Sequence, residues 1–352
     1  MKLRGAISGF GQVAEQGHLP GWRRRPEVEI VAIHEPIAER RQAALRAIKN
    51  VRVYEDLGLL LAGESPDFVD IASPPAYHAG AARAALEAGA HVLVEKPLCL
   101  DLKTLDDLYS LGSSHRRTLF CVHNWKHSPV YRRASEAISA GVLGGVSYCA
   151  LTRLRTQQAG GAPWRVDPVI GGGGILIDHG WHVFYLMQWL MGGQAPLTIG
   201  ARLEVFPPGV VDEVADLTAT FSGGRLGHIH LSWRAPARRT SAILYGDEGM
   251  LEIEDSTIRL TRRSRGSEDL PVIEEPDNSY HPAWFAALAE EFEAAIAQGP
   301  QGRITRQNQR EAQTALAILL AAKTSQASAG TPISLSGGRE NIEQDPETGS
   351  SR

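Results

Sequence analysis

The sequence predicts an α/β protein of two domains, the first built on a parallel sheet and the second on a mainly antiparallel sheet. Three observations support this fold class. Strand-like and helix-like segments alternate up to residue 122, a glycine-rich motif follows the first strand, and strands joined by short turns dominate residues 197–260. Alternating strands and helices are typical of βαβ units, whereas hairpin-length links are typical of antiparallel sheets.

Length and composition are those of a globular protein. A chain of 352 residues favours about two domains, and 43% hydrophobic and 22% charged residues are ordinary values. The net charge of −4 gives no general attraction to nucleic acid or anionic membrane, so neither is expected as a partner. Cys99, Cys121 and Cys149 lack metal or disulfide spacing. With no signal peptide and no apolar run of spanning length, we expect a cytoplasmic location.

The first strand, residues 3–8, leads into a nucleotide-binding motif. The motif reads Gly9-Phe10-Gly11-Gln12-Val13-Ala14 and is followed by a segment that could be helical. The first glycine permits the tight turn, the second lets the backbone approach a pyrophosphate, and the third small residue permits close packing of helix on strand. The helix N-terminus then offers unpaired N–H groups to phosphate oxygens.

An acidic residue follows the second predicted strand, residues 29–34. Glu35 lies about twenty residues after the motif, where a carboxylate accepts hydrogen bonds from a ribose 2′-OH and repels a 2′-phosphate. This favours NAD as cofactor, although Arg40 and Arg41 leave NADP open. The alternative is an exposed glutamate at the start of a helix over 37–48.

The alternation then continues to residue 122. We expect strands over 51–54, 68–72, 91–95 and 118–122, and helices up to 62 and over 77–87 and 102–111. Ser73-Pro74-Pro75 ends one strand on the edge that carries Gly9, so this loop could contact the adenosine half of a dinucleotide, with His78 opening the next helix. Glu95-Lys96-Pro97 ends another strand, which places Lys96 in the crevice where open sheets bind ligands. A lysine that only reaches solvent is the alternative.

The second half begins after Asn124. We expect a helix over 129–140, a strand over 146–155, and a loop rich in glycine and glutamine that ends at Trp164-Arg165. Four glycines, 171–174, precede a strongly apolar helix over 175–191. Predicted strands cover 197–206, 214–221, 226–233, 240–245, 250–253 and 257–260, followed by helices over 281–298 and 306–325. The polar tail, residues 336–352, is expected to be disordered.

The apolar helix carries Asp178-His179-Gly180-Trp181-His182. Residues four apart share a helix face, so Asp178 could orient the imidazole of His182, and a histidine with a pKa near neutrality suits acid–base work on an alcohol. Two alternatives stay open. One is an ordinary Asp–His pair, and the other is a metal site built from Asp178, His179, His182 and His123.

In this order and separation, the motifs resemble the Gfo/Idh/MocA oxidoreductases. The resemblance covers nearly the whole chain, from Gly9-Phe10-Gly11 through Glu95-Lys96-Pro97 and Trp164-Arg165 to Asp178-His179-Gly180-Trp181-His182. It implies an NAD(P)-binding Rossmann domain over residues 1–124 and a substrate-binding α/β domain over 125–335. The second domain would have an open, mainly antiparallel sheet that often makes oligomer contacts, so a homodimer or homotetramer is expected.

The resemblance also implies site residues. Lys96, Asp178 and His182 would be catalytic and no metal would be needed. The expected cofactor contacts are Gly9, Phe10, Gly11, Gln12, Val13, Glu35, Ser73, Pro74, His78, Glu95 and Lys96. The expected substrate contacts are Lys96, Asn124, Trp164, Arg165, Asp178 and His182, with the pocket further shaped by His123 and the loop 157–163.

The implied reaction is hydride transfer between a nicotinamide and a secondary alcohol or ketone of a sugar, sugar derivative or cyclic polyol. His182 would take the hydroxyl proton, Lys96 would hydrogen-bond the same oxygen, and Asp178 would orient its partners. Two alternatives are a glycoside hydrolase that retains and recycles NAD and a non-catalytic dinucleotide-binding regulator. One departure is Tyr185, which stands where many members carry an acid.

Overall fold

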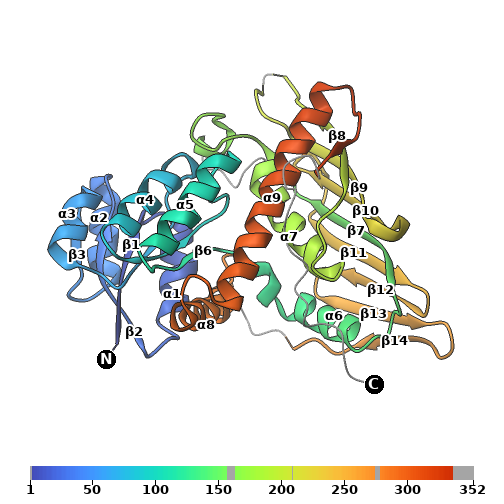
Figure 1. Cartoon of the computed structure of the whole chain (residues 1–352), viewed down its shortest axis with the longest axis horizontal. Coiled ribbons are helices and arrows are strands. Elements are labelled where there is room, and N and C mark those ends of the chain that lie inside the picture. The colour runs from blue at the N-terminus through green and yellow to red at the C-terminus, as the bar shows by residue number, and fades with distance from the viewer. Residues whose placement is uncertain (1, 157–162, 208, 274–277, 336–352) are drawn as a thin grey trace.

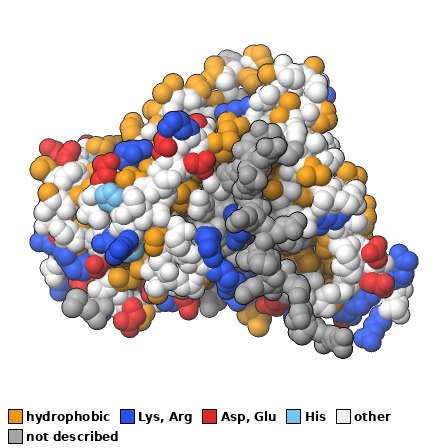
Figure 2. All heavy atoms as spheres, in the orientation of Figure 1, with side chains coloured by type: hydrophobic (Ala, Val, Ile, Leu, Met, Phe, Trp, Pro, Cys, Tyr) orange, Lys and Arg blue, Asp and Glu red, His pale blue; other side chains and the backbone are white. Residues whose placement is uncertain are grey.

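The computed structural model describes residues 2–156, 163–207, 209–273 and 278–335. A parallel sheet with its helices forms one side of the molecule, and a larger sheet forms the other side (Figure 1). The long helix α9 (Arg303–Ala327) lies between them. Acidic and basic side chains are interspersed over the face in Figure 2. Residues 157–162 of the predicted loop 157–163 and the whole tail 336–352 fall outside the described residues.

The first sheet has six parallel strands in the order β3-β2-β1-β4-β5-β6. Its strands are β1 (Leu3–Ser8), β2 (Val28–His34), β3 (Arg52–Tyr54), β4 (Phe68–Ile71), β5 (His91–Val94) and β6 (Leu119–Cys121). The helices around it are η1 (Ala14–His18), α1 (Leu19–Trp22), α2 (Ala38–Ala47), α3 (Leu57–Glu64), η2 (Pro75–Tyr77), α4 (His78–Glu87) and α5 (Leu102–Ser114). The predicted alternation of strands and helices is confirmed.

Within the described residues, nine strands form the second sheet, in the order β14-β13-β12-β11-β7-β10-β9-β8-β15. All pairs are antiparallel except β7 with β10. The bounds are β7 (Val146–Leu154), β8 (Thr198–Glu204), β9 (Val214–Thr220), β10 (Leu226–Ser232), β11 (Arg239–Gly246), β12 (Gly249–Glu254), β13 (Thr257–Arg262), β14 (Gly266–Leu270) and β15 (Ile333–Ser334). The predicted fold class is therefore confirmed, with β14 and β15 as additional edge strands.

Six further helices belong to the second half of the described chain: η3 (Asn124–His127), α6 (Pro129–Ser139), η5 (Pro163–Val166), η6 (Leu176–Gly180), α7 (Trp181–Leu190) and α8 (Pro282–Gln298). A short 3-10 turn, η7 (Ser222–Gly224), links β9 to β10. The predicted helix over 175–191 is divided, because η6 is a π-helical turn and α7 continues from it. Such turns are rare and often mark functional sites.

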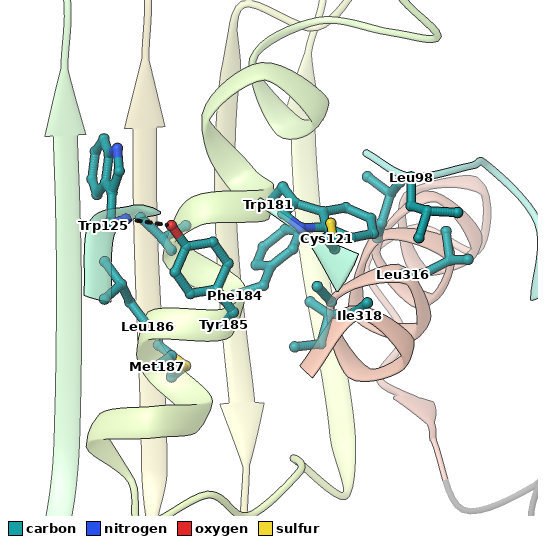
Figure 3. Close-up of a cluster of buried hydrophobic side chains, with 14 of the residues drawn as sticks. Leu98, Cys121, Trp125, Trp181, Phe184, Tyr185, Leu186, Met187, Leu316 and Ile318 are labelled. Carbon is teal, nitrogen blue, oxygen red and sulfur yellow. Dashed lines mark hydrogen bonds between the residues drawn. The ribbon is translucent and has the colours of Figure 1, made fainter. Parts of the chain in front are cut away.

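The core joins the two halves of the chain. Phe285 and Phe292 of α8 share one apolar cluster with Phe68 and Phe120 of the parallel sheet. In a second cluster, Trp181 lies with side chains of α9, β6 and the loop after β5 (Figure 3). The C-terminal helices therefore pack back onto the first sheet. A boundary at residue 124 thus separates two parts of the sequence but not two separate hydrophobic cores. The domain limits remain a prediction.

Two further expectations concern the cysteines and the membrane. Cys99, Cys121 and Cys149 are buried free thiols. No helix in the described ranges combines the length and the apolar character needed to cross a bilayer.

Candidate active site

A cavity of about 370 Å³ lies at the carboxyl ends of β4 and β5, where they face the second domain. Its volume falls in the range of small-molecule sites. Ten of the predicted site residues line it: Val13, Ser73, His78, Glu95, Lys96, Asn124, Trp164, Arg165, Asp178 and His182. The other six predicted cofactor residues lie outside its lining: Gly9, Phe10, Gly11, Gln12, Glu35 and Pro74.

The glycine-rich loop closes against the loop after β4. Gly9 has a φ of +92°, and a side-chain Cβ at this position would lie 2.7 Å from the backbone nitrogen of Ser73. At Gly11 the space is open, since the nearest atom to such a Cβ would be Nη1 of Arg40 at 3.8 Å. Ala14 is fully buried. The three small residues therefore have the geometry that a pyrophosphate-binding turn requires.

The predicted cofactor residues around this loop differ in what they contact. Phe10 is 1% exposed, so it offers the cofactor no accessible side chain, and its backbone N–H donates to Glu35 at 2.8 Å. The second oxygen of Glu35 accepts the N–H of Ile37 at 2.9 Å. The Gln12 side chain accepts the hydroxyl of Tyr280 at 3.1 Å. Glu35 thus stabilises the loop and is 2% exposed, which contradicts the exposed-glutamate alternative, while its ribose contact stays a prediction.

His78 ties together the two strand-end loops that line the cavity. It is 1% exposed, and its ring nitrogens lie 2.7 Å from the carbonyl oxygen of Pro97 and 2.6 Å from that of Ser73. Carbonyl oxygens only accept hydrogen bonds, and burial lowers the pKa of His78, so the neutral ring donates its single N–H to one of the two oxygens at a time. The structure thus gives His78 a positioning role for both loops.

Lys96 is anchored inside the cavity. Its Nζ donates to the backbone oxygen of Asp178 at 2.7 Å and lies 3.6 Å from Oδ1 of the same residue. The side chain is 13% exposed, and the Lys96–Pro97 peptide is cis. The alternative of a lysine that simply reaches solvent is therefore wrong.

Behind Lys96 lies a buried polar chain that the sequence analysis missed. His18 places Nδ1 3.0 Å from both carboxylate oxygens of Asp70 and Nε2 3.1 Å from Oε1 of Glu95. Trp22 also donates to Asp70, at 2.7 Å. The other oxygen of Glu95 accepts the N–H of Lys96 at 3.0 Å. A residue of η1, the helix that follows the glycine-rich loop, therefore holds Glu95 in place. No sequence motif signals this contact, because His18, Asp70 and Glu95 come from separate elements.

The charge on His18 predicts a pH-dependent stability. Burial lowers the pKa of His18, but Asp70 and Glu95 outweigh it and raise the pKa to about 9. The folded state thus binds a proton more tightly than the unfolded state, so this stabilisation is complete below the unfolded pKa of about 6.5 and is lost as the pH rises through about 9. We expect His18→Gln to flatten the alkaline decline of Tm measured over this range. An exposed-histidine control, His115→Gln, should keep the decline; equal slopes in both variants would contradict the assignment.

The carboxylate of Asp178 is surrounded by basic side chains. Its Oδ1 lies 3.1 Å from Nη1 of Arg165, and its Oδ2 lies 3.7 Å from Nε2 of His179. Burial raises the pKa of Asp178, but His179, Lys96 and Arg165 together hold it below its usual range. Asp178 is therefore ionised and fixes both Lys96 and Arg165.

The predicted contact between Asp178 and His182 is wrong, because no hydrogen bond or ion pair in the described ranges joins them. Nδ1 of His182 instead lies 3.0 Å from the hydroxyl of Tyr185, and this hydroxyl accepts the N–H of Trp125 at 3.0 Å. Burial, followed by the charges of Lys96 and Arg153, lowers the pKa of His182 well below its usual value. His182 is neutral at pH 7, and Tyr185 is its partner where an acid was expected.

Two more residues that the sequence analysis missed, Trp125 and Arg153, complete this side of the cavity. Trp125 stacks on His182 with ring centroids 4.7 Å apart, and the guanidinium of Arg153 lies 3.9 Å over the Trp125 ring. Arg153 donates from Nε to Nδ1 of His179 at 2.9 Å. His182, Trp125 and Arg153 thus form one layered stack, which sequence spacing could not reveal.

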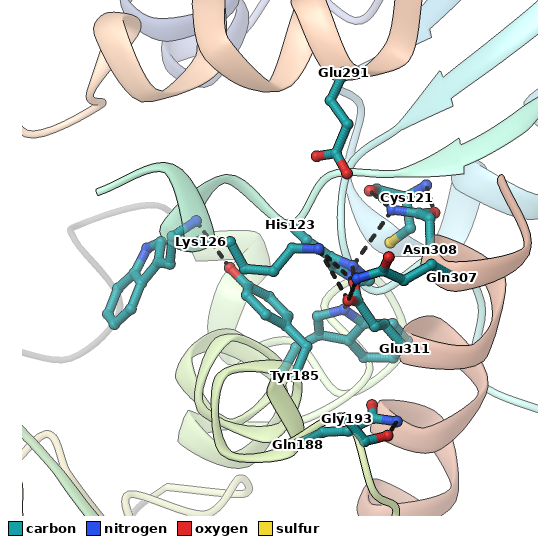
Figure 4. A network of polar contacts seen from close by, with 12 residues as sticks. Cys121, His123, Lys126, Tyr185, Gln188, Gly193, Glu291, Gln307, Asn308 and Glu311 are labelled. Carbon is teal, nitrogen blue, oxygen red and sulfur yellow. Dashed lines mark hydrogen bonds and ion pairs between the residues drawn. The ribbon is translucent and has the colours of Figure 1, made fainter. Parts of the chain in front are cut away.

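His123 does not line the cavity, contrary to expectation. It lies in a buried network with Lys126, Asn308 and Glu311, which fixes the loop after β6 to α9 (Figure 4). Nζ of Lys126 lies 2.7 Å from Oε2 of Glu311, and His123 lies 3.0 Å from the same oxygen. The alternative metal site of Asp178, His179, His182 and His123 finds no support, since no group of three or more His, Cys, Asp or Glu side chains in the described part of the chain is arranged so that it could hold a metal ion.

Asp212 fixes the start of the helix that carries Asp178. Its carboxylate accepts the N–H groups of Gly174 and Leu176, and its backbone oxygen accepts that of Ile175. A Cβ on Gly174 would collide with the Asp212 backbone. We therefore expect Gly174→Ala to lower the free energy of unfolding by about 1 to 3 kcal/mol and to reduce activity, measured by denaturant melts and initial rates. Gly80→Ala, where a Cβ meets nothing within 4 Å, is the control; wild-type behaviour of Gly174→Ala would contradict this role.

Family models match both halves of the chain. Residues 3–123 match the oxidoreductase family with the NAD-binding Rossmann fold, and residues 131–252 match the GFO/IDH/MocA C-terminal domain. D-apiose dehydrogenase from Paraburkholderia graminis is 31% identical over 304 residues, which is 84% of this chain and 78% of the relative. D-glucoside 3-dehydrogenase from Escherichia coli is 29% identical over 203 residues, and the match spans 57% of each chain.

Solved structures show the same fold. Levoglucosan dehydrogenase, in complex with NADH and levoglucosan, has a TM-score of 0.83 at 20% identity, with 95% of this chain and 100% of that chain covered. An oxidoreductase from Agrobacterium radiobacter, in complex with NAD⁺, L-tartaric acid and magnesium, has a TM-score of 0.83 at 17% identity, with 96% and 99% covered. Together with the family matches, these findings confirm the resemblance. The chain belongs to the GFO/IDH/MocA oxidoreductase family and carries its NAD-binding Rossmann domain.

Proposed function

We propose that the protein is an NAD-dependent dehydrogenase that interconverts a secondary alcohol and a ketone on a sugar, a sugar derivative or a cyclic polyol. The observation that carries the proposal is the convergence of Lys96, Asp178 and His182 on one cavity at the carboxyl edge of the NAD-binding sheet. The names of two relatives, D-glucoside 3-dehydrogenase and D-apiose dehydrogenase, support a sugar as substrate class.

The residues present fit a dinucleotide. Gly9 and Gly11 supply the backbone for the pyrophosphate, and Ser73 and Asn124 border the cavity with buried side-chain oxygens that have no hydrogen-bond partner in the described chain. Buried polar atoms without partners are rare and often await a ligand. NAD supplies the hydride acceptor when it is bound. Glu35 favours NAD. Because Arg40 lies beside Gly11 and could bind a 2′-phosphate, the activity test includes NADP.

Lys96 would hold the reacting oxygen. Its ammonium is fixed by Asp178 and borders the cavity, so it could donate a hydrogen bond to the substrate hydroxyl and stabilise the negative charge that develops there. Asp178 keeps the lysine and Arg165 in place through its own negative charge. No metal is needed for this electrostatic role.

His182 would accept or return the hydroxyl proton. The Tyr185 hydroxyl can accept a hydrogen from Nδ1 or donate one to it, so the same partner serves both neutral tautomers of the ring. With Nδ1 protonated, Nε2 holds a free lone pair for the proton of an alcohol; with Nε2 protonated, it donates to a ketone oxygen. This arrangement suits a reaction that runs in both directions.

The test is nicotinamide absorbance with purified protein and a panel of inositols, aldoses, uronic acids and amino sugars, each with NAD and with NADP. We expect net reduction of NAD by one class of sugar or polyol. Binding of NAD without net reduction by any member would contradict the proposal and favour a recycled cofactor or a regulatory role.

We also infer a cytoplasmic homodimer or homotetramer. The second sheet exposes Leu226, Ile243 and Tyr245, whose exposed fractions of 50%, 41% and 42% are high for large apolar residues. Burial of such a face against a second copy would be favourable. Light scattering coupled to size-exclusion chromatography tests this, and a monomer at micromolar concentration would contradict it.

A further inference from the structure

We infer that the substrate carries an oxyanion, a carboxylate or a phosphate, which binds to Arg153, Arg155 and Arg238, where the active-site cavity adjoins a second cavity. This inference rests on the proposed function for the position of the reacting alcohol. It adds the chemical class of the substrate and names the residues that select it.

The charge of the cavity supports an anionic ligand. Five lysine and arginine side chains line it, namely Lys96, Arg153, Arg155, Arg165 and Arg238, against two carboxylates. Both carboxylates are already engaged, because Glu95 contacts His18 and Asp178 contacts Lys96 and Arg165. The positive charge of the remaining arginines is therefore not balanced within the described cavity wall.

Arg153, Arg155 and Arg238 form a distinct cluster. Arg153 lies in β7, and Arg155 directly follows the strand and donates its N–H to the Ser232 oxygen, so the alternation of an extended chain places both side chains on one side. Arg238 comes from the link between β10 and β11. No carboxylate of the described residues lies within ion-pair distance of any of the three; Arg153 and Arg155 bond to His179, Thr240 and backbone oxygens. Burial and the neighbouring charge of Arg238 lower the pKa of Arg155 to about 10, as expected where like charges lie close together.

A second cavity meets the first at these arginines. It has a volume of about 620 Å³ and shares Trp125, Arg153, Arg155, Arg238, Ser279 and His281 with the first cavity. Asp255 is its one acidic lining residue in the described chain, beside five arginines. The stacked rings of His281 and Trp284 also line it. There is thus room for a substrate group that extends past the reacting sugar.

Unpaired buried donors mark the same region. Nε of Arg165 and Nε1 of Trp233 are buried, and neither has a hydrogen-bond partner in the described ranges. Both residues line the first cavity, and Ser128, whose buried hydroxyl is also unpaired, lines the second. An N–H group only donates, so a ligand that satisfies Arg165 and Trp233 must bring acceptors such as carboxylate, phosphate or hydroxyl oxygens.

The layered stack connects the reacting end to the anionic end. His182 stacks on the Trp125 ring, and the guanidinium of Arg153 also lies over that ring. A sugar with its alcohol at His182 and Lys96 could therefore place a substituent next to Arg153 while its ring passes Trp125. Guanidinium groups bind carboxylates and phosphates through paired hydrogen bonds, which gives both affinity and orientation.

The test is calorimetric binding to the full-length protein loaded with NADH, which cannot take a hydride from the sugar, so the heat reports binding. The ligands are matched pairs of one neutral and one anionic sugar: D-glucose with D-glucuronate, D-galactose with D-galacturonate, and D-glucose with D-glucose 6-phosphate. We expect the anionic member of at least one pair to bind about tenfold or more tightly. The uronate and phosphate arms distinguish the two sources of the oxyanion.

One double variant and one control variant test whether the arginine cluster causes the preference for anionic sugars. Arg155→Gln with Arg238→Gln should reduce the anionic-to-neutral affinity ratio about tenfold or more and leave NAD affinity unchanged. Arg239→Gln is the matched control, because Arg239 neighbours the cluster but pairs with Glu254 and lines neither cavity. Equal affinity for both members of every pair, or a ratio that the double variant leaves unchanged, would overturn the inference. Such a result would not bear on the proposed dehydrogenase activity, which the measurement of net NAD reduction tests separately.

Discussion

Lys96→Met should lower kcat by at least about 10³-fold while NAD affinity stays within about twofold of wild type. Methionine preserves much of the volume of the lysine stem but removes the ammonium, which lies 2.7 Å from the Asp178 backbone oxygen and borders the cavity. The group that stabilises charge on the substrate oxygen is then absent. Initial rates of NADH formation and a titration of NAD by fluorescence check the two parts of this expectation.

The control for this substitution is Lys103→Met. Lys103 lies on α5, and its side chain is 85% exposed and pairs with Asp107. It should therefore keep wild-type rates. If the Lys96→Met protein turns over at a near wild-type rate, Lys96 is not catalytic. If the variant loses NAD binding together with turnover, Lys96 has a structural role.

His182→Gln should lower kcat by about 10²- to 10⁴-fold, because glutamine can hydrogen-bond the substrate oxygen but cannot take its proton. The pKa of His182 is held well below its usual value, so the ring is neutral over the physiological range and loses its lone pair only as the pH falls through the lowered value. Alcohol oxidation by wild type should thus stay level as the pH falls from about 8 to about 6.5. Initial rates over this range test the expectation.

Tyr185→Phe separates the positioning role from catalysis. It removes the hydroxyl that pairs with Nδ1 of His182 and accepts the Trp125 N–H, so we expect a moderate loss of kcat with KM little changed. A matched change at an exposed tyrosine, Tyr77→Phe, should have no effect.

If His182→Gln retains full activity, or if the wild-type oxidation rate falls with a midpoint near the ordinary histidine pKa, the role given to His182 is wrong.

Much of the fold could be predicted from the sequence because its signals are local. The strands around Gly9 and Lys96 are short apolar runs that end in glycine or proline, and such runs predict buried parallel strands. By contrast, β14 is Gly266–Leu270, a polar edge strand without alternating apolar residues, so no pattern announces it. The packing of α8 on the first sheet was also missed, since an apolar helix face does not show which of two cores it enters.

The site was predicted in part for the same reason. Lys96, Asp178 and His182 stand in recognisable motifs and do meet at one cavity. The partner of His182 was predicted wrongly, because cations from other elements engage the carboxylate of Asp178 and leave the ring to Tyr185. His18 was missed because its two carboxylate partners lie 52 and 77 residues away in the sequence. Contacts of this kind depend on tertiary structure and leave no spacing signal.

The most direct test of the central claim is isotope transfer from the substrate to the cofactor. The substrate found in the absorbance panel is prepared with deuterium on its carbinol carbon, incubated with NAD and the wild-type protein, and the nicotinamide product is analysed by mass spectrometry. We predict one deuterium per NADH formed and no transfer with Lys96→Met. Formation of unlabelled NADH, or return of the label to a cleaved sugar without net NADH, would contradict a dehydrogenase that transfers hydride in this cavity.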